Sequence, residues 1–90
     1  MSHDLSPELT ELYKTHVPDY MANIEKSFAD GDIGNMKDVA HNLASAMGLI
    51  GDTISSELSR KLEKEEMTTE EMSSIIEELS RSVSETLATL

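Results

Sequence analysis

Apolar residues return every three or four positions along most of this 90-residue chain, which is the spacing of one face of an α-helix. The clearest stretch spans residues 33–50, and its apolar positions are Ile33, Met36, Ala40, Leu43, Met47 and Ile50. No stretch of useful length alternates apolar and polar residues as a half-buried strand would. The pattern therefore predicts an all-α fold.

Helix start and stop signals divide the pattern into four segments. Ser6-Pro7-Glu8 combines a serine cap with a first-turn proline, and Asp30-Gly31-Asp32 is typical of a tight turn between antiparallel helices. Gly51-Asp52 marks a third boundary, and Thr68-Thr69-Glu70-Glu71 has the capping-box pattern of a fourth helix start. We expect residues 1–90 to form one domain, an antiparallel up-down four-helix bundle whose first helix is kinked or broken near Pro18.

The other three segments have apolar faces of their own. The first carries Leu9, Leu12, Tyr13, Val17, Tyr20, Met21, Ile24 and Phe28. The third has a narrow stripe of Ile54, Leu58 and Leu62, and the fourth carries Met72, Ile75, Ile76, Leu79, Val83, Leu87 and Leu90. Four such faces are enough for a monomer to close its own core, so we expect a monomer.

Charge excludes several classes of partner. The chain holds 18 acidic and seven basic residues, a formal net charge of −11. Such an excess repels nucleic-acid phosphates and anionic lipid headgroups, so we expect no nucleic acid and no membrane partner. The start MSHDLSPELT lacks the features of a signal peptide, and no run approaches the roughly 18 apolar residues of a membrane span. A cytoplasmic protein is therefore expected.

One histidine lies among small and apolar residues in the stretch DVAHNLASAMGLIG. At about 100° per residue, His41 falls roughly 130° from the centre of the apolar stripe and is predicted to face solvent. The same projection surrounds it with Gly34, Lys37, Ala44, Ser45 and Gly48. Glycine costs a helix about 1 kcal/mol relative to alanine, so we interpret this low surface as clearance for another protein's active site. The alternative is an exposed histidine without a role, with Gly48 simply near a helix end.

The remaining histidines and acidic residues carry no comparable pattern. His3 lies in the N-terminal segment, where we expect the chain to fray, and His16 lies near Pro18 without small neighbours, so neither is expected to have a functional role. No His-x-x-x-His spacing occurs, and the many acidic residues are typical of solvated helix faces, so no metal site is predicted.

Around His41 the sequence resembles the histidine-containing phosphotransfer (HPt) domain family. The matching positions are Ala40-His41, Leu43, Gly51 and Leu62-Glu63, and the acidic turn before the histidine helix is similar as well. The resemblance extends from Leu9 onward. It implies a helical bundle in which His41 accepts and donates a phosphoryl group in a phosphorelay.

Two positions depart from the family pattern. Ala44 stands where the family has a lysine, and Ser45 stands where it has a glycine. In the family the lysine is thought to hold the phosphoryl group or meet the partner's acidic pocket, and the glycine to leave clearance for docking. Lys37 lies one helical turn before His41, so we hypothesise that its ammonium replaces the missing charge, while Ser45 can donate a hydrogen bond to the phosphoryl oxygens. The alternative is that Lys37 is an ordinary solvated lysine.

The resemblance also implies the partners and the chemistry. An imidazole that is largely neutral near neutral pH is a nucleophile without a dedicated base, and we expect Nε2 to attack a partner's aspartyl phosphate. The expected partners are response-regulator receiver domains, which would supply magnesium, and a hybrid sensor kinase. The sequence contains no glycine-rich nucleotide loop, so we predict a phosphoryl carrier with no cofactor and no kinase activity of its own.

Two other classes of function stay open at this point. The departures at Ala44 and Ser45 favour a diverged, non-phosphorylated HPt-like adaptor or inhibitor that binds a kinase or receiver. A dimerising scaffold bundle with an unrelated partner is the third possibility.

Overall fold

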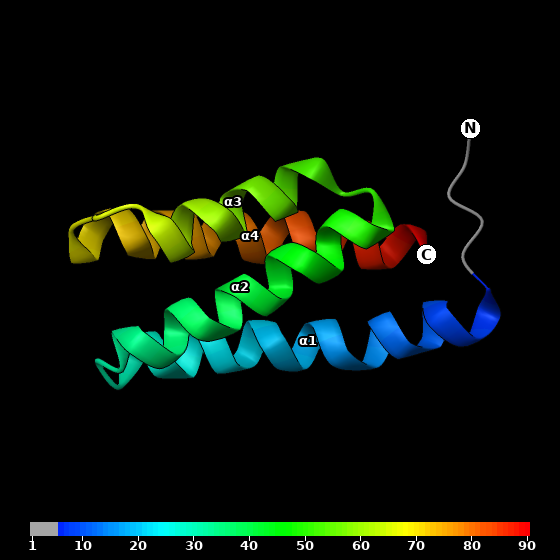
Figure 1. Cartoon of the computed structure of the whole chain (residues 1–90), viewed down its shortest axis with the longest axis horizontal. Helices are drawn as coiled ribbons and strands as arrows, with labels where there is room; N and C mark the ends of the chain where they lie inside the picture. The colour runs from blue at the N-terminus through cyan, green and yellow to red at the C-terminus, as the bar shows by residue number, and fades with distance from the viewer. Residues whose placement is uncertain (1–5) are drawn as a thin grey trace.

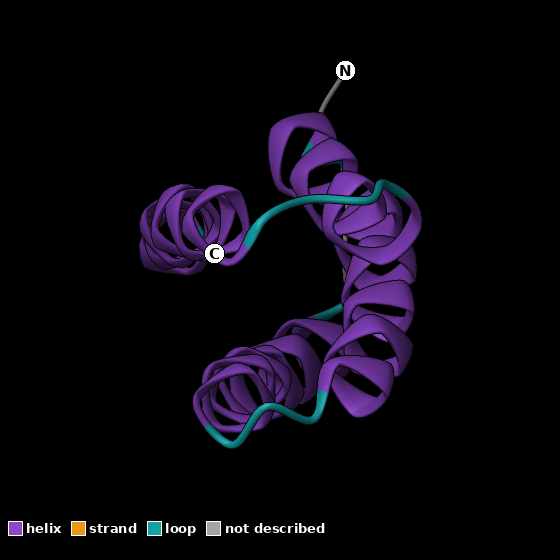
Figure 2. Ribbon diagram, turned by 90° about the vertical axis from the view of Figure 1, so that its left-hand side faces the viewer, coloured by secondary structure: helices purple, strands orange, loops and turns teal. Residues whose placement is uncertain are grey.

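The computed structural model describes residues 6–90, which form four helices joined by short turns (Figure 1). These are α1 (Pro7–Ala29), α2 (Ile33–Ile50), α3 (Thr53–Lys64) and α4 (Thr69–Thr89), and this part of the chain contains no strand. Successive helices pack against one another and α4 also contacts α1, so α2 and α4 lie across the bundle from each other (Figure 2). The predicted all-α four-helix bundle is confirmed.

The helices begin at the residues that the sequence marks as caps. Each cap side chain accepts a hydrogen bond from a backbone N–H in the first turn of its helix. The four caps are Ser6, Asp32, Asp52 and Thr68, the last within a complete capping box. Gly31 and Gly51 follow α1 and α2 with positive φ angles of 77° and 93°, the left-handed conformation that glycine adopts at low cost.

Pro18 lies inside α1, and the helix continues through it without interruption. The predicted break is therefore wrong, and of the two alternatives only a bend is compatible with the structure. Pro18 is exposed, and a proline that costs a helix one backbone hydrogen bond is most easily accommodated on a face that water can reach.

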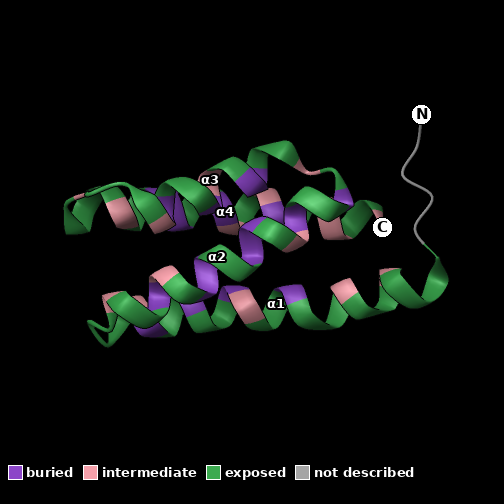
Figure 3. Cartoon of the chain, viewed as in Figure 1, coloured by how far each residue is buried: buried purple, intermediate pink, exposed green. Residues whose placement is uncertain are grey.

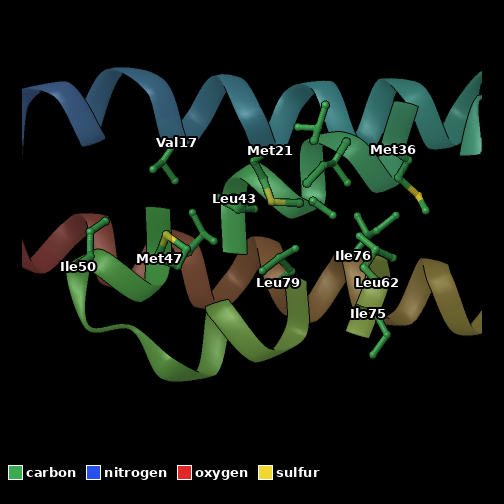
Figure 4. Packing of buried hydrophobic residues seen from close by; sticks show 14 residues of the cluster. Val17, Met21, Met36, Leu43, Met47, Ile50, Leu62, Ile75, Ile76 and Leu79 are labelled. Carbon is green, nitrogen blue, oxygen red and sulfur yellow. The ribbon is translucent and has the colours of Figure 1, made fainter. Parts of the chain in front are cut away.

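The core lies where the four helices converge, and α2 contributes more of it than any other helix (Figure 4). Met36, Leu43 and Met47 of α2 are completely buried, as are Ile24 of α1 and Leu79 of α4. α2 packs against both α1 and α3, which explains why its apolar stripe is the clearest in the sequence.

The first turns of α1 extend beyond the other helices and are largely exposed (Figures 1 and 3). Leu9 and Leu12 are 43% and 49% exposed, although they continue the apolar face that Val17, Met21 and Ile24 bury. The apolar periodicity therefore predicted correctly which side of α1 faces the core. It did not predict that the first turns of α1 extend beyond the other helices and stay exposed.

The inner face of α3 consists largely of serine. Ser55, Ser56, Ser59 and Leu62 are its buried residues, whereas Ile54 is 67% exposed. The predicted stripe of Ile54, Leu58 and Leu62 is therefore wrong at Ile54. Serine side chains are small enough to bring α3 close to α2. The Ser56 hydroxyl donates to the Ala44 carbonyl of α2, while those of Ser55 and Ser59 donate to the Asp52 carboxylate and the Ser55 carbonyl, so their burial costs little.

Candidate functional site

His41 lies on the solvent-facing edge of α2. Its side chain is 61% exposed, while its neighbours Ala40, Leu43 and Ala44 are buried in the core. The imidazole therefore stands at the border between the packed face of α2 and water, where a partner protein can reach it.

The imidazole is held from the neighbouring helix by a carboxylate. Nδ1 of His41 lies 3.0 Å from Oε2 of Glu63 on α3, whose side chain is only 19% exposed. A carboxylate can only accept hydrogen bonds, so the neutral imidazole carries its proton on Nδ1 in this arrangement. The lone pair is then on Nε2, the nitrogen that makes no hydrogen bond within residues 6–90.

The other oxygen of Glu63 has an unusual environment. Oε1 is buried and accepts no hydrogen bond from any residue in the range 6–90. A buried carboxylate oxygen without a donor is costly. The contact with His41 is therefore the hydrogen bond through which this carboxylate is satisfied within residues 6–90.

Sequence reasoning matched the Leu62-Glu63 pair to the family but gave Glu63 no role. The helical repeat places Glu63 about 40° around the helix from Ser59, which is completely buried, and therefore near the inner edge of α3. It does not give the register of α3 against α2, which decides which residue of α2 the carboxylate meets.

Small residues line the seam between α2 and α3. Ala44 is 2% exposed, and its carbonyl oxygen accepts a hydrogen bond from the Ser56 hydroxyl at 2.9 Å. A Cβ on Gly48 would lie 3.5 Å from the same hydroxyl oxygen. The projection that placed Ala44 on the outer face is therefore wrong, because α3 covers that side of α2, and the small side chain at 44 gives α3 room to approach. Gly48 stays exposed, and a Cβ there would make only ordinary contact with Ser56.

The other predicted neighbours of His41 lie along the exposed side of α2. Gly34 is exposed in the first turn and Ser45 is exposed one turn after His41, while Lys37 is half-buried one turn before it. Within residues 6–90, Lys37 forms no ion pair. The structure therefore aligns Gly34, Lys37, Ser45 and Gly48 on the side of α2 that carries His41 and removes Ala44 from this group.

The other histidines are not part of this arrangement. His16 is exposed on α1, and His3 lies outside the described residues. Across residues 6–90, no group of three or more His, Cys, Asp or Glu side chains is placed to hold a metal ion. None of the described helices is long and apolar enough to cross a bilayer.

A helical bundle that presents to solvent an imidazole oriented by a carboxylate from the next helix is the arrangement of a histidine-presenting domain. The family model of the Hpt domain matches residues 8–89, so the chain belongs to the Hpt domain family. No curated protein and no solved structure matched the chain. Membership supports a role in histidine phosphotransfer within phosphorelays, where Hpt domains interact with receiver domains and kinases.

Proposed function

We propose that this chain is a phosphorelay carrier in which His41 shuttles a phosphoryl group between receiver-domain aspartates. The observation that carries the proposal is the exposed imidazole whose Nδ1 hydrogen-bonds to Glu63 and whose Nε2 makes no hydrogen bond within residues 6–90. The proposed partners are response-regulator receivers and a hybrid sensor kinase. We propose that the carrier acts as a cytoplasmic monomer and relies on magnesium bound by the receiver.

The transfer step needs no proton to leave the site. The Nε2 lone pair attacks the phosphorus of the partner's aspartyl phosphate, the P–N bond forms, and the P–O bond breaks with its electron pair returning to the aspartate carboxylate. The ring then carries both the Nδ1 proton and the phosphoryl group and is formally cationic. The Glu63 carboxylate stabilises that charge, and the reverse step onto a second aspartate returns the lone pair to Nε2.

The proposed docking surface is the exposed side of α2 around His41. Gly34, Ser45 and Gly48 are small and exposed there, so a receiver can approach the imidazole without displacing bulky groups. Lys37, half-buried and without an ion pair within residues 6–90, is the proposed cation on the α2 side of the phosphoryl group. Ser45 is the proposed hydroxyl donor on the other side.

The deciding experiment is incubation of the protein with a receiver phosphorylated on its aspartate, followed by analysis of the label. We expect a label that is stable in base and lost in acid, as a phosphohistidine is. His41→Gln should abolish the label, whereas His16→Gln, which changes another exposed histidine, should leave it intact. Label that persists in His41→Gln, or no label on the wild-type protein, overturns the proposal.

One observation favours a second candidate, an adaptor or inhibitor that binds a kinase or receiver without carrying phosphate. Position 44 is occupied by a buried methyl group, so no side chain there can meet a phosphoryl group. The adaptor predicts that His41→Gln leaves partner binding and regulation unchanged, whereas the carrier predicts lost signalling. Binding measured by titration calorimetry, beside a signalling assay, separates the two.

A further inference from the structure

The basic residues of this acidic chain gather on the helices that carry the site. Residues 33–64 contain Lys37, Arg60, Lys61 and Lys64, balanced by Asp38, Asp52, Glu57 and Glu63. This segment is therefore neutral, and the whole net charge of −11 belongs to residues 1–32 and 65–90. An anionic group approaching α2 and α3 meets less repulsion than it would elsewhere on the surface.

A phosphoryl group on Nε2 of His41 creates an electrostatic problem. It adds about two negative charges to a ring whose other nitrogen already contacts the carboxylate of Glu63. The buried methyl group of Ala44 offers no compensation from the next turn of α2. A phosphoryl group on His41 therefore needs a positively charged side chain from outside the His41–Ala44 turn of α2.

Arg60 is placed to supply it. On α3, Glu63 contacts His41, and Ser56 donates to the carbonyl of Ala44, so the segment between them passes along the His41–Ala44 turn of α2. Arg60 lies in this segment, about 60° around the helix from Glu63 and about 40° from Ser56. It is exposed, whereas the residues on the other side of that line, such as Ser59 and Leu62, are completely buried.

This geometry brings Arg60 to the solvent rim of the α2–α3 seam, the same rim on which His41 is exposed. The other two cations of α3 are less well placed, since Lys64 lies about 100° and Lys61 about 160° around the helix from Glu63. Within residues 6–90, Arg60 forms no ion pair. Its guanidinium is planar and binds phosphoryl oxygens through two parallel hydrogen bonds.

We infer that Arg60 is a phosphoryl-binding residue of this site, supplying from α3 the positive charge that α2 lacks at position 44. The inference rests on the proposed phosphotransfer role of His41. In this arrangement Arg60 on α3 and Lys37 on α2 contact the phosphoryl group from opposite sides.

The test uses phosphoramidate as a small donor, so that His41 is phosphorylated without a docking protein. Arg60→Ala should lower the rate of His41 phosphorylation about tenfold, as loss of one charge-assisted contact implies, and Arg60→Lys should recover part of it. Lys61→Ala is the matched control, because it removes the same charge from the adjacent residue, which points away from Glu63, and it should change the rate less than about twofold. The ³¹P chemical shift of the phosphohistidine should move in Arg60→Ala and not in Lys61→Ala.

The possible outcomes distinguish the role of Arg60 from the proposal that His41 carries a phosphoryl group. Equal rates and equal ³¹P shifts for Arg60→Ala and Lys61→Ala, with the wild-type protein labelled normally, overturn the role of Arg60 and leave the carrier proposal intact. A wild-type protein that takes no label from phosphoramidate or from a phosphorylated receiver overturns both. Thermal melts establish that each variant is folded, and Arg60→Gln repeats the test with a side chain of similar length.

Discussion

Nδ1 of His41 and Oε2 of Glu63 lie 3.0 Å apart and join α2 to α3 across the surface of the bundle. The carboxylate is mostly buried while the imidazole is mostly exposed. Glu63 is therefore the better-anchored partner, and the position and tautomer of the ring follow from it.

Removal of that carboxylate should change the tautomer of His41. In Glu63→Ala, Nδ1 loses its acceptor, so a larger share of neutral rings will carry the proton on Nε2 and will be unreactive there. We expect phosphorylation of His41 to slow about tenfold, the equivalent of one hydrogen bond of about 1.4 kcal/mol. Imidazole ¹⁵N chemical shifts measure the tautomer directly, and a stopped-flow or quench assay measures the rate.

Two variants sharpen this prediction. Glu63→Gln keeps an acceptor oxygen near Nδ1 and should retain the tautomer while losing the negative charge beside the ring. Glu66→Ala removes an exposed carboxylate just after α3 and should leave both measurements unchanged. Identical ¹⁵N shifts in Glu63→Ala and the wild-type protein would contradict the assignment of the proton to Nδ1.

The buried face of α3 should not tolerate a large side chain at position 59. Ser59 is completely buried, and its hydroxyl donates to the carbonyl of Ser55 at 2.8 Å. We expect Ser59→Leu to lower the free energy of unfolding by about 1–3 kcal/mol through overpacking and to weaken the His41–Glu63 contact by displacing α3. Ser84→Leu, at an exposed position of α4, should change stability by less than about 0.5 kcal/mol in the same urea titration.

Periodicity and caps predicted most of the fold because both are local. Asp32 and Thr68 cap helices through contacts within a few residues, so the sequence reveals them directly. The residues whose burial was predicted wrongly lie where helices end or where two helices meet. Ile54 continues an apolar stripe but is exposed, while Ser56 looks polar and is buried because its hydroxyl reaches the Ala44 carbonyl twelve residues away in the chain.

In the candidate site, too, some residues follow from the pattern of one helix and others only from the packing of two helices. The exposure of His41 follows from the helical projection of α2 alone, and the structure agrees with it. Glu63 and Ala44 depend on how α3 crosses α2, which no pattern within one helix contains. The small residues around His41 were interpreted as clearance for a partner, and on the side of Ala44 they are instead clearance for α3.

Acid should weaken the start of α4 through Glu71. Its Oε1 accepts a hydrogen bond from the backbone N–H of Thr68 at 2.9 Å, and this bond holds the pKa of Glu71 below its ordinary value of 4.5. A lowered pKa means that the ionised form stabilises the fold above the unfolded-state pKa, and that this contribution is lost as the pH falls through the folded-state pKa. A ¹³C titration of the carboxyl group should therefore give a midpoint below 4.5.

Replacement of this glutamate isolates its share of the acid sensitivity. Glu71→Gln keeps an oxygen acceptor but cannot titrate, so it should lose less stability than the wild-type protein as the pH is lowered below about 4.5. Parallel pH dependences of the two unfolding curves would show that the capping box does not respond to acid.

The corner between α2 and α3 should depend on Asp52 more strongly than an ordinary helix cap does. Its carboxylate accepts hydrogen bonds from the backbone N–H of Ser55 at 3.0 Å, from the Ser55 hydroxyl at 2.6 Å and from the Thr86 hydroxyl of α4. Asp32 caps α2 with a carboxylate that accepts from the backbone of Asn35, so Asp32→Ala should cost about 1 kcal/mol. Asp52→Ala should cost roughly 1–2 kcal/mol more, because it also leaves the completely buried Ser55 hydroxyl with only the Ser82 hydroxyl as a side-chain partner and removes the acceptor of the Thr86 hydroxyl of α4. Urea unfolding followed by circular dichroism measures both, and equal losses in the two variants would mean that Asp52 acts only as a local cap and does not tie α3 to α4.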